Sequence, residues 1–103
     1  MVLSNFRCFQ LASRLYRECL ELEMPSHLRS QLDRASSSIA LNLAEGVGRS
    51  SYKDQRHFFT MAMGSTKEVQ AILALGQTAP ETVIDLADHL AASIHRLIKM
   101  PPR

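Results

Sequence analysis

Few side chains in this sequence could hold a metal ion, and they are widely separated. The four histidines are His27, His57, His89 and His95, and no two of them lie four residues apart, the spacing at which two ligands share a helix face. Neither cysteine has a second cysteine at metal-ligand spacing. The sequence therefore predicts no metal site and no bound cofactor.

One pair of residues has the chemistry of an acid and a base. Asp85 and His89 are one helical turn apart and could form a hydrogen bond, as two members of a catalytic triad do. No serine or cysteine is placed by the sequence to complete a triad, and a surface pair is the simpler interpretation. We therefore expect no catalytic residue and no enzymatic activity, and a small hydrolase is the least favoured hypothesis.

A second group of candidate residues is basic. Arg49, Lys53 and Arg56 recur at the i, i+4, i+7 spacing of one helix face, with His57 adjacent. Cations in the first turns of a helix oppose its dipole by about a few tenths of a kcal/mol each, so local helix stability does not explain them. Two interpretations stay open: a solvated face, or a surface that contacts phosphates.

A third group is polar and lies at the edge of a predicted core stripe. Asn42 is at this edge, and residues at three- and four-residue spacing continue the line along the same segment. Polar groups near a core need partners, because an unsatisfied buried group costs roughly 1–3 kcal/mol. We predict a polar clasp that fixes helix register, with a ligand site as the alternative. Its members are Arg34, Asn42, Glu45 and, on the following helix as a partner for Arg34 or Asn42, Glu68.

The elements that must position these side chains are predicted to be helices. Apolar residues recur at three- and four-residue spacing in four segments, and no segment alternates as a strand does. The predicted core lines are Cys8, Ala12, Leu15, Cys19 and Leu22; Leu28, Leu32, Ala35, Ile39 and Leu43; Phe58, Phe59, Ala62, Ser65, Val69, Ile72, Leu73 and Gly76; and Val83, Leu86, Ala87, Leu90, Ile94 and Leu97. Four such helices joined by short links pack most simply as an all-α, antiparallel up-down four-helix bundle.

Polar residues and glycines predict where the helices begin and end. Ser26 is the candidate N-cap of the second helix, and Gly46 is expected to end that helix in the left-handed conformation. One of the serines at 50–51 is expected to cap the third helix. Thr78, with Glu81 three residues later, forms a capping-box pattern for the fourth.

Length and composition are those of a single domain over residues 1–103. The chain is 46% hydrophobic with a net charge of +2, which excludes disorder and is too weakly basic for nucleic-acid binding by overall charge alone. No apolar run approaches the roughly 18–20 residues of a membrane span, so we expect no membrane association and a cytoplasmic location. Cys8 and Cys19 lie about 16 Å apart on one predicted helix, too far for a disulfide, and are expected to be buried thiols of a reducing compartment.

Both central helices have a second apolar face. Leu41 lies away from the core line of the second helix, Ala44 widens its apolar arc, and Met63 does the same on the third helix. Isolated exposed apolar residues are normal, but the recurrence on two consecutive helices favours a subunit interface. We predict a homo-oligomer that uses these three residues.

The stretch from Leu28 to Leu75 carries a specific pattern of small, polar and aromatic residues. Its members are Gln31, Arg34-Ala35, Ser38-Ile39, Asn42-Leu43-Ala44-Glu45-Gly46, Arg49, Phe58, Ala62, Gly64-Ser65 and Glu68. This pattern, in a stretch of nearly half the chain, resembles the four-helix-bundle proteins encoded by intervening sequences within bacterial large-subunit ribosomal RNA genes. The resemblance implies a cytoplasmic up-down bundle, commonly a homopentamer, with no known enzymatic activity.

Relatives of that family include the accessory variability determinant of diversity-generating retroelements, a basic bundle that binds a reverse transcriptase and nucleic acid. The leading hypothesis is therefore a non-enzymatic, oligomeric adaptor in an RNA- or retroelement-associated complex. Its candidate partners are RNA and a reverse transcriptase, and Arg49, Lys53 and Arg56 are the candidate nucleic-acid contacts. The alternative is a purely structural or protein-binding module that does not contact nucleic acid.

Overall fold

Helices dominate the structure, a computed structural model that describes Leu3 and residues 6–100. The helices are α1 (Arg7–Leu20), α2 (Ser26–Val47), α3 (Tyr52–Gly76) and α4 (Glu81–Lys99). No strand occurs among the described residues. The predicted all-α fold with four helices is thus confirmed.

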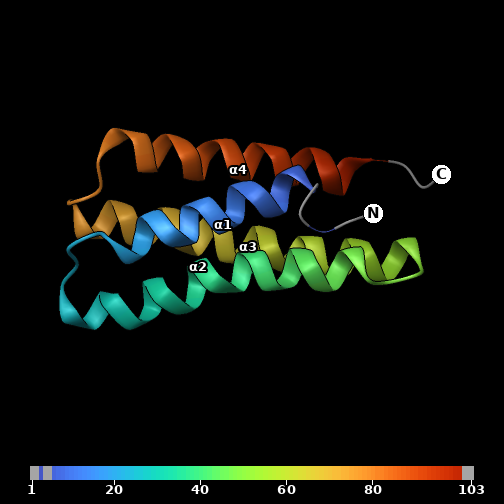
Figure 1. Ribbon diagram of the computed structural model, residues 1–103, viewed down its shortest axis with the longest axis horizontal. Coiled ribbons are helices and arrows are strands. Elements are labelled where there is room, and N and C mark those ends of the chain that lie inside the picture. The colour runs from blue at the N-terminus through green and yellow to red at the C-terminus, as the bar shows by residue number, and fades with distance from the viewer. Residues whose placement is uncertain (1–2, 4–5, 101–103) are drawn as a thin grey trace.

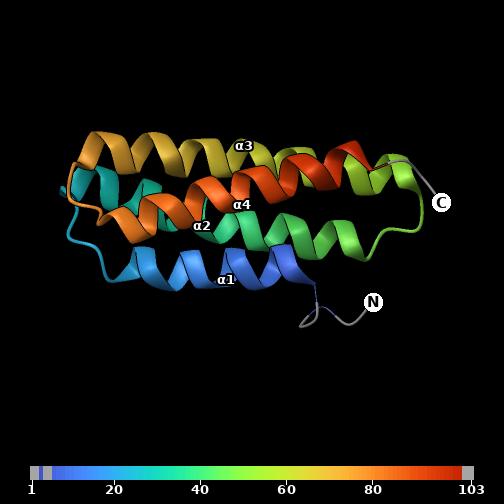
Figure 2. The ribbon, with the colours of Figure 1, turned by 90° about the horizontal axis from the view of Figure 1, so that it is seen from above.

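The four helices lie side by side along the long axis of the molecule (Figures 1 and 2). Helix α1 packs on α2 and α4, and α3 packs on the same two helices, so the four surround one core. The α1–α2 and α3–α4 connections lie at one end, whereas the α2–α3 turn and the end of α4 lie toward the other, and the shorter α1 begins in that half (Figure 1). Charged residues far apart in the sequence are therefore gathered at the same end of the molecule.

Most of the core comes from the predicted apolar lines. All five predicted core residues of α2, from Leu28 to Leu43, are buried. The prediction is wrong for Ser65, which is only half-buried, because the adjacent Thr66 lies on the inner line of α3 instead. Thr66 is fully buried, and its hydroxyl is not left without a partner, because it donates a hydrogen bond of 2.8 Å to the Ala62 carbonyl. The remaining exceptions among the predicted core residues are half-buried: Leu22, Phe58, Gly76 and Leu97.

Gly46 does not end α2, contrary to the prediction. The helix continues to Val47, and Gly46 is buried with a negative φ. A Cβ atom at this position would lie 2.6 Å from Cε1 of Phe59 and 3.2 Å from Cβ of Phe58. Glycine is therefore required by the close approach of α3 to the last turn of α2, not by the backbone conformation of a helix end.

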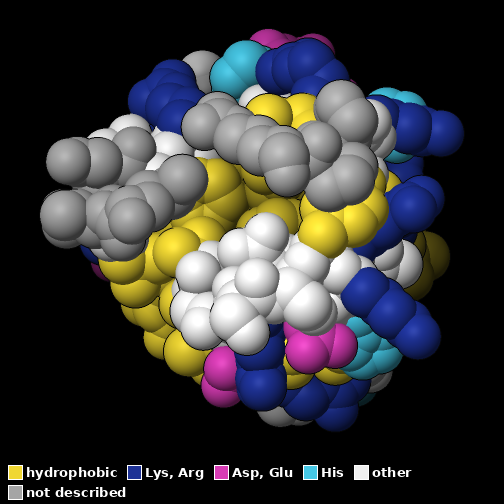
Figure 3. All heavy atoms as spheres, turned by 90° about the vertical axis from the view of Figure 1, so that its right-hand side faces the viewer, with side chains coloured by type: hydrophobic (Ala, Val, Ile, Leu, Met, Phe, Trp, Pro, Cys, Tyr) yellow, Lys and Arg dark blue, Asp and Glu magenta, His cyan; other side chains and the backbone are white. Residues whose placement is uncertain are grey.

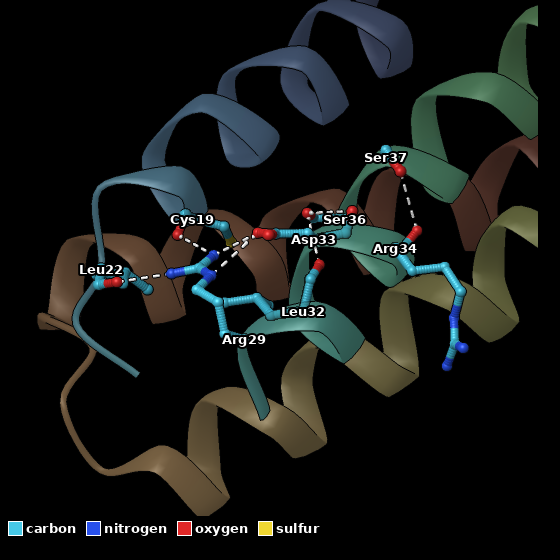
Figure 4. Close-up of polar contacts among 8 residues, drawn as sticks. All are labelled: Cys19, Leu22, Arg29, Leu32, Asp33, Arg34, Ser36 and Ser37. Carbon is cyan, nitrogen blue, oxygen red and sulfur yellow. Dashed lines mark hydrogen bonds and ion pairs between the residues drawn. The ribbon is translucent and has the colours of Figure 1, made fainter. Parts of the chain in front are cut away.

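The connection between α1 and α2 is held by Arg29 (Figure 4). Its guanidinium donates hydrogen bonds to the carbonyl of Cys19 at 2.9 Å and to that of Leu22 at 2.7 Å, and it forms an ion pair of 2.6 Å with Asp33. Ser26 is the first residue of α2 and makes no capping hydrogen bond, so its prediction as N-cap is wrong. The connection is fixed by Arg29, which satisfies carbonyls at the C-terminus of α1.

The α3–α4 connection also differs from its prediction. Helix α4 begins at Glu81 after Pro80 with no side-chain cap, so the capping box does not form. The Thr78 hydroxyl donates instead to the Glu23 carbonyl, at 2.6 Å, and joins the two connections at this end of the bundle. The left-handed residue after α3 is Gln77, with φ 58°, directly after Gly76, the last residue of the helix.

Candidate nucleic-acid interface

The α2–α3 turn and the first turns of α3 carry the three predicted basic contacts. Ser51 caps α3, because its hydroxyl oxygen accepts a hydrogen bond of 3.1 Å from the Asp54 backbone N–H, and this confirms the prediction for the serines at 50–51. The cap places Arg49 in the turn, two residues before Ser51. The prediction that Arg49 lies on the same helix face as Lys53 and Arg56 is therefore wrong.

Arg49 is held by neighbours of its own. Its guanidinium lies 3.4 Å from the Glu45 carboxylate and 4.6 Å above the centre of the Phe58 ring. Its carbonyl accepts a hydrogen bond of 3.0 Å from the Gln55 side chain. The carboxylate offsets part of the positive charge of Arg49, and the ring adds a cation–π contact to its guanidinium.

Lys53 and Arg56 have a different environment. They line a shallow hollow of about 350 Å³ together with Tyr52, His57 and Thr60. Among the described residues, neither cation forms an ion pair with a carboxylate. The two charges are thus available to an anion from solution. Figure 3 faces this end of the molecule and shows Lys, Arg and His side chains along much of its edge, beside exposed hydrophobic side chains.

Charge is segregated along the bundle, a feature that the overall charge of +2 conceals. The half of the bundle that contains residues 6–11, 39–64 and 91–100 has two acidic residues, Glu45 and Asp54, and six Lys or Arg residues. These are Arg7, Arg49, Lys53, Arg56, Arg96 and Lys99, which leaves this half at +4 with neutral histidines. The other half, residues 12–38 and 65–90, has five Lys or Arg and eight Asp or Glu residues, a balance of −3. We call the first the basic half.

The four residues of the predicted clasp do not meet in one cluster. Arg34 of α2 forms an ion pair of 3.5 Å with Glu68 of α3, as the sequence suggested, but both side chains are largely exposed. Glu45 is also exposed and pairs with Arg49 in the turn. The acidic and basic members of the clasp are therefore solvent-facing contacts between neighbouring segments.

Asn42 makes the more buried contact. Its amide donates hydrogen bonds to the carbonyl and hydroxyl oxygens of Ser38, at 2.9 and 3.0 Å. The Ser38 hydroxyl in turn lies 2.9 Å from that of Ser65 on α3. A short polar chain thus connects α2 to α3. Ser65 was predicted as a core residue, and its hydroxyl completes this link instead.

The predicted oligomer residues differ in exposure. Leu41 is 67% exposed, whereas Ala44 and Met63 are half-buried and Met63 packs against the core. Leu75, which the sequence analysis did not single out, is 70% exposed, and Met61 is 44% exposed. Both lie on one outward line of α3, separated by four helical turns, so their spacing could have revealed them.

The described part of the chain offers no obvious centre for metal or thiol chemistry. None of its His, Cys, Asp and Glu side chains form a group of three that could hold a metal ion. Cys8 and Cys19 are free and buried. Burial raises the pKa of the Cys8 thiol and raises that of Cys19 to about 11, so both stay protonated near neutral pH, in the poorly nucleophilic form. No helix between residues 6 and 100 is both long and apolar enough to cross a membrane.

The fold and this end of the molecule define a class: a small all-α protein of four helices with one basic half. The family model of the 23S rRNA-intervening sequence protein matches residues 5–101, which is nearly the whole chain. The chain therefore belongs to the 23S rRNA-intervening sequence protein family. No curated protein matches its sequence significantly.

Proposed function

We propose that this chain is a non-enzymatic, antiparallel up-down four-helix bundle that self-associates and binds RNA through its basic half, as an adaptor in an RNA- or retroelement-associated complex. The observation that carries the proposal is the segregation of charge, which leaves the basic half at +4 while the whole chain is at +2. The family's name, 23S rRNA-intervening sequence protein, supports RNA as the polyanion. Buried, protonated thiols suit the reducing cytoplasm.

The electrostatic argument favours phosphate contact. Each phosphate that a Lys or Arg neutralises releases counterions, which makes the affinity fall as salt rises. Lys53 and Arg56 form no ion pair among the described residues, so an incoming phosphate does not have to displace a bound carboxylate. Phosphate contacts by Lys53, Arg56 and Arg49 on single-stranded RNA would together predict a loss of about 20-fold in affinity between 50 and 200 mM salt.

Self-association would multiply this surface. Leu41, at 67% exposed, lies on α2 in the basic half, and covering it against a second copy removes an exposed apolar side chain from water. Identical basic halves on one rigid assembly act together on a long RNA and raise avidity by about 10²–10⁴. A homopentamer, the state that the family resemblance implies, is the assembly we propose, with a reverse transcriptase as a candidate protein partner.

The test is an RNA titration with charge-reversal variants. The test variant is Arg49→Glu, Lys53→Glu, Arg56→Glu, and the control, Arg14→Glu, Arg17→Glu, Lys67→Glu, makes the same change in net charge in the acidic half. We expect salt-dependent binding by the parent and the control, with at least a tenfold loss in the test variant. Equal affinity of the two variants, or no binding by the parent at low salt, would replace the proposal with the protein-only module.

A separate measurement tests self-association. Light scattering coupled to gel filtration should give several times the chain mass of 11.5 kDa for the parent. Leu41→Glu should reduce that mass without loss of helicity, because Leu41 contributes little to the core of the chain. A monomeric parent at micromolar concentration would refute the oligomer.

A further inference from the structure

The hollow at the start of α3 has more than positive charge. Its lining combines an aromatic ring, Tyr52, with two cations, a histidine and the Thr60 hydroxyl. Its volume of about 350 Å³ lies at the lower end of the range for ligand pockets, about 300–1,000 Å³. This is room for a group of the size of one nucleotide.

Tyr52 is held in a fixed position. Its hydroxyl donates a hydrogen bond of 2.7 Å to the Met100 carbonyl, directly after the end of α4. The side chain remains partly exposed and lines the hollow. A ring tethered at its tip loses little further freedom when a flat group stacks on it, so it is a suitable platform for a nucleobase.

The charges around this ring are of one sign. At about 100° per residue, the five lining residues fall within an arc of about 140° on α3. Asp54 is the one acidic residue between positions 52 and 60, and its position lies outside this arc. Lys53 and Arg56 therefore face an incoming phosphate with no carboxylate of this segment beside them.

The two remaining lining residues add hydrogen-bonding capacity. The Thr60 hydroxyl donates to the Arg56 carbonyl at 2.8 Å, which leaves its oxygen free to accept from a ribose hydroxyl or a base amino group. His57 is positioned by the edge of Phe58, with ring centres 5.5 Å apart. The polar groups thus lie on one side of the Tyr52 ring, within the same arc of α3.

We infer that this hollow binds one unpaired nucleotide, with its base stacked on Tyr52 and its phosphate on Lys53 and Arg56. The inference rests on the RNA binding proposed above and specifies the form of RNA: single-stranded segments are preferred over duplex, because bases in a duplex are stacked on each other and cannot reach the ring. Sequence preference is weak, since every base has a flat face.

The experiment compares short, unstructured oligo(A) with a blunt RNA duplex of the same length by fluorescence anisotropy. Tyr52→Leu removes the ring, whereas Tyr52→Phe keeps the ring and removes only the hydroxyl. We expect the parent to prefer the single strand and Tyr52→Leu to lose about 5- to 150-fold in affinity for it, whereas Tyr52→Phe, which keeps the ring but loses its tether, should lose much less than Tyr52→Leu. Circular dichroism checks that both variants are folded.

A second readout follows the ring itself. The chain has two tyrosines and no tryptophan, so Tyr16→Phe leaves Tyr52 as the sole source of intrinsic fluorescence above that of phenylalanine. Oligo(A) should quench this emission, and the midpoint of the quenching should fall at the same oligo(A) concentration as that of the anisotropy titration. Inorganic polyphosphate, which has no base to stack, should not quench it. Equal affinity for strand and duplex, unchanged in Tyr52→Leu and without quenching, would overturn the inference while salt-dependent binding upheld the proposed function. Absence of all RNA binding would overturn both.

Discussion

Gly46 offers a direct test of the packing between α2 and α3. In Gly46→Ala, the added methyl group would lie 2.6 Å from Cε1 of Phe59. The ring is 8% exposed and packs against Phe6 with centres 6.2 Å apart, so it has little room to move. Cβ of Phe58, at 3.2 Å, is tied to the backbone of α3. The helices must therefore separate slightly to accept the methyl group.

The expected magnitude follows from two opposing effects. Alanine is favoured over glycine inside a helix by about 1 kcal/mol, whereas forcing extra volume into a packed core costs about 1–3 kcal/mol. Because backbone and ring both resist displacement, we expect a packing cost in the upper part of this range, about 2–3 kcal/mol, which exceeds the helix gain by about 1–2 kcal/mol. For a chain of this length, the thermal midpoint should fall by about 4–16 °C.

Gly64 supplies the matched control. It lies inside α3 but is exposed, and an added Cβ would have no atom within 4 Å. Gly64→Ala should therefore raise the free energy of unfolding by about 0.5–1 kcal/mol. Thermal unfolding followed by circular dichroism at one protein concentration compares both variants with the parent. If Gly46→Ala were stabilised as much as Gly64→Ala, the close-approach argument would be wrong.

Three further predictions concern single side chains. Arg29→Ala should lower the free energy of unfolding by about 1–3 kcal/mol in chemical denaturation, because two carbonyls and Asp33 lose a charged donor. Asn42→Ala should cost about 0.5–1.5 kcal/mol and Glu45→Ala less than about 0.5 kcal/mol, and the reverse order would contradict the assignment of Glu45 to a surface pair. The pKa of Cys19 is raised to about 11 in the folded chain, so unfolding should become easier between pH 9 and 11, and this pH dependence should weaken in Cys19→Ala.

The core of α2 could be predicted from the sequence, and the ends of the helices mostly could not. The line from Leu28 to Leu43 depends only on spacing along one helix, which the sequence contains. A cap depends on what a side chain meets in space. The Thr78 hydroxyl bonds to Glu23, a residue 55 positions earlier, instead of capping its own helix. No local pattern contains that contact.

The candidate site was likewise predictable from the sequence only where it depends on residue type and local spacing. Residue types indicated a basic surface, but helical spacing placed Arg49 on a face that it does not share, because Ser51 caps α3 and Arg49 lies in the turn before the cap. The hollow was missed although Tyr52, Arg56 and Thr60 recur at four-residue spacing, a signal that was present in the sequence. The hydrogen bond from Tyr52 to Met100, which fixes the ring, depends on how α3 and α4 pack.

Segregated charge also bears on how copies of the chain assemble. A ring with all bundles in the same orientation brings basic halves of +4 together, and their repulsion opposes assembly. An alternating arrangement sets each basic half against an acidic half of −3 and gains from attraction.

Salt screens both the repulsion between basic halves and the attraction between basic and acidic halves. Rising salt should therefore strengthen the same-orientation ring and weaken the alternating arrangement. In the same-orientation ring, an RNA that bridges neighbouring basic halves replaces their repulsion with attraction to its phosphates. By linkage, RNA must stabilise whichever assembly binds it most tightly. Sedimentation at low and moderate salt, with and without RNA, distinguishes the two: assembly that grows with salt and with RNA supports the ring, whereas assembly that salt dissociates refutes it.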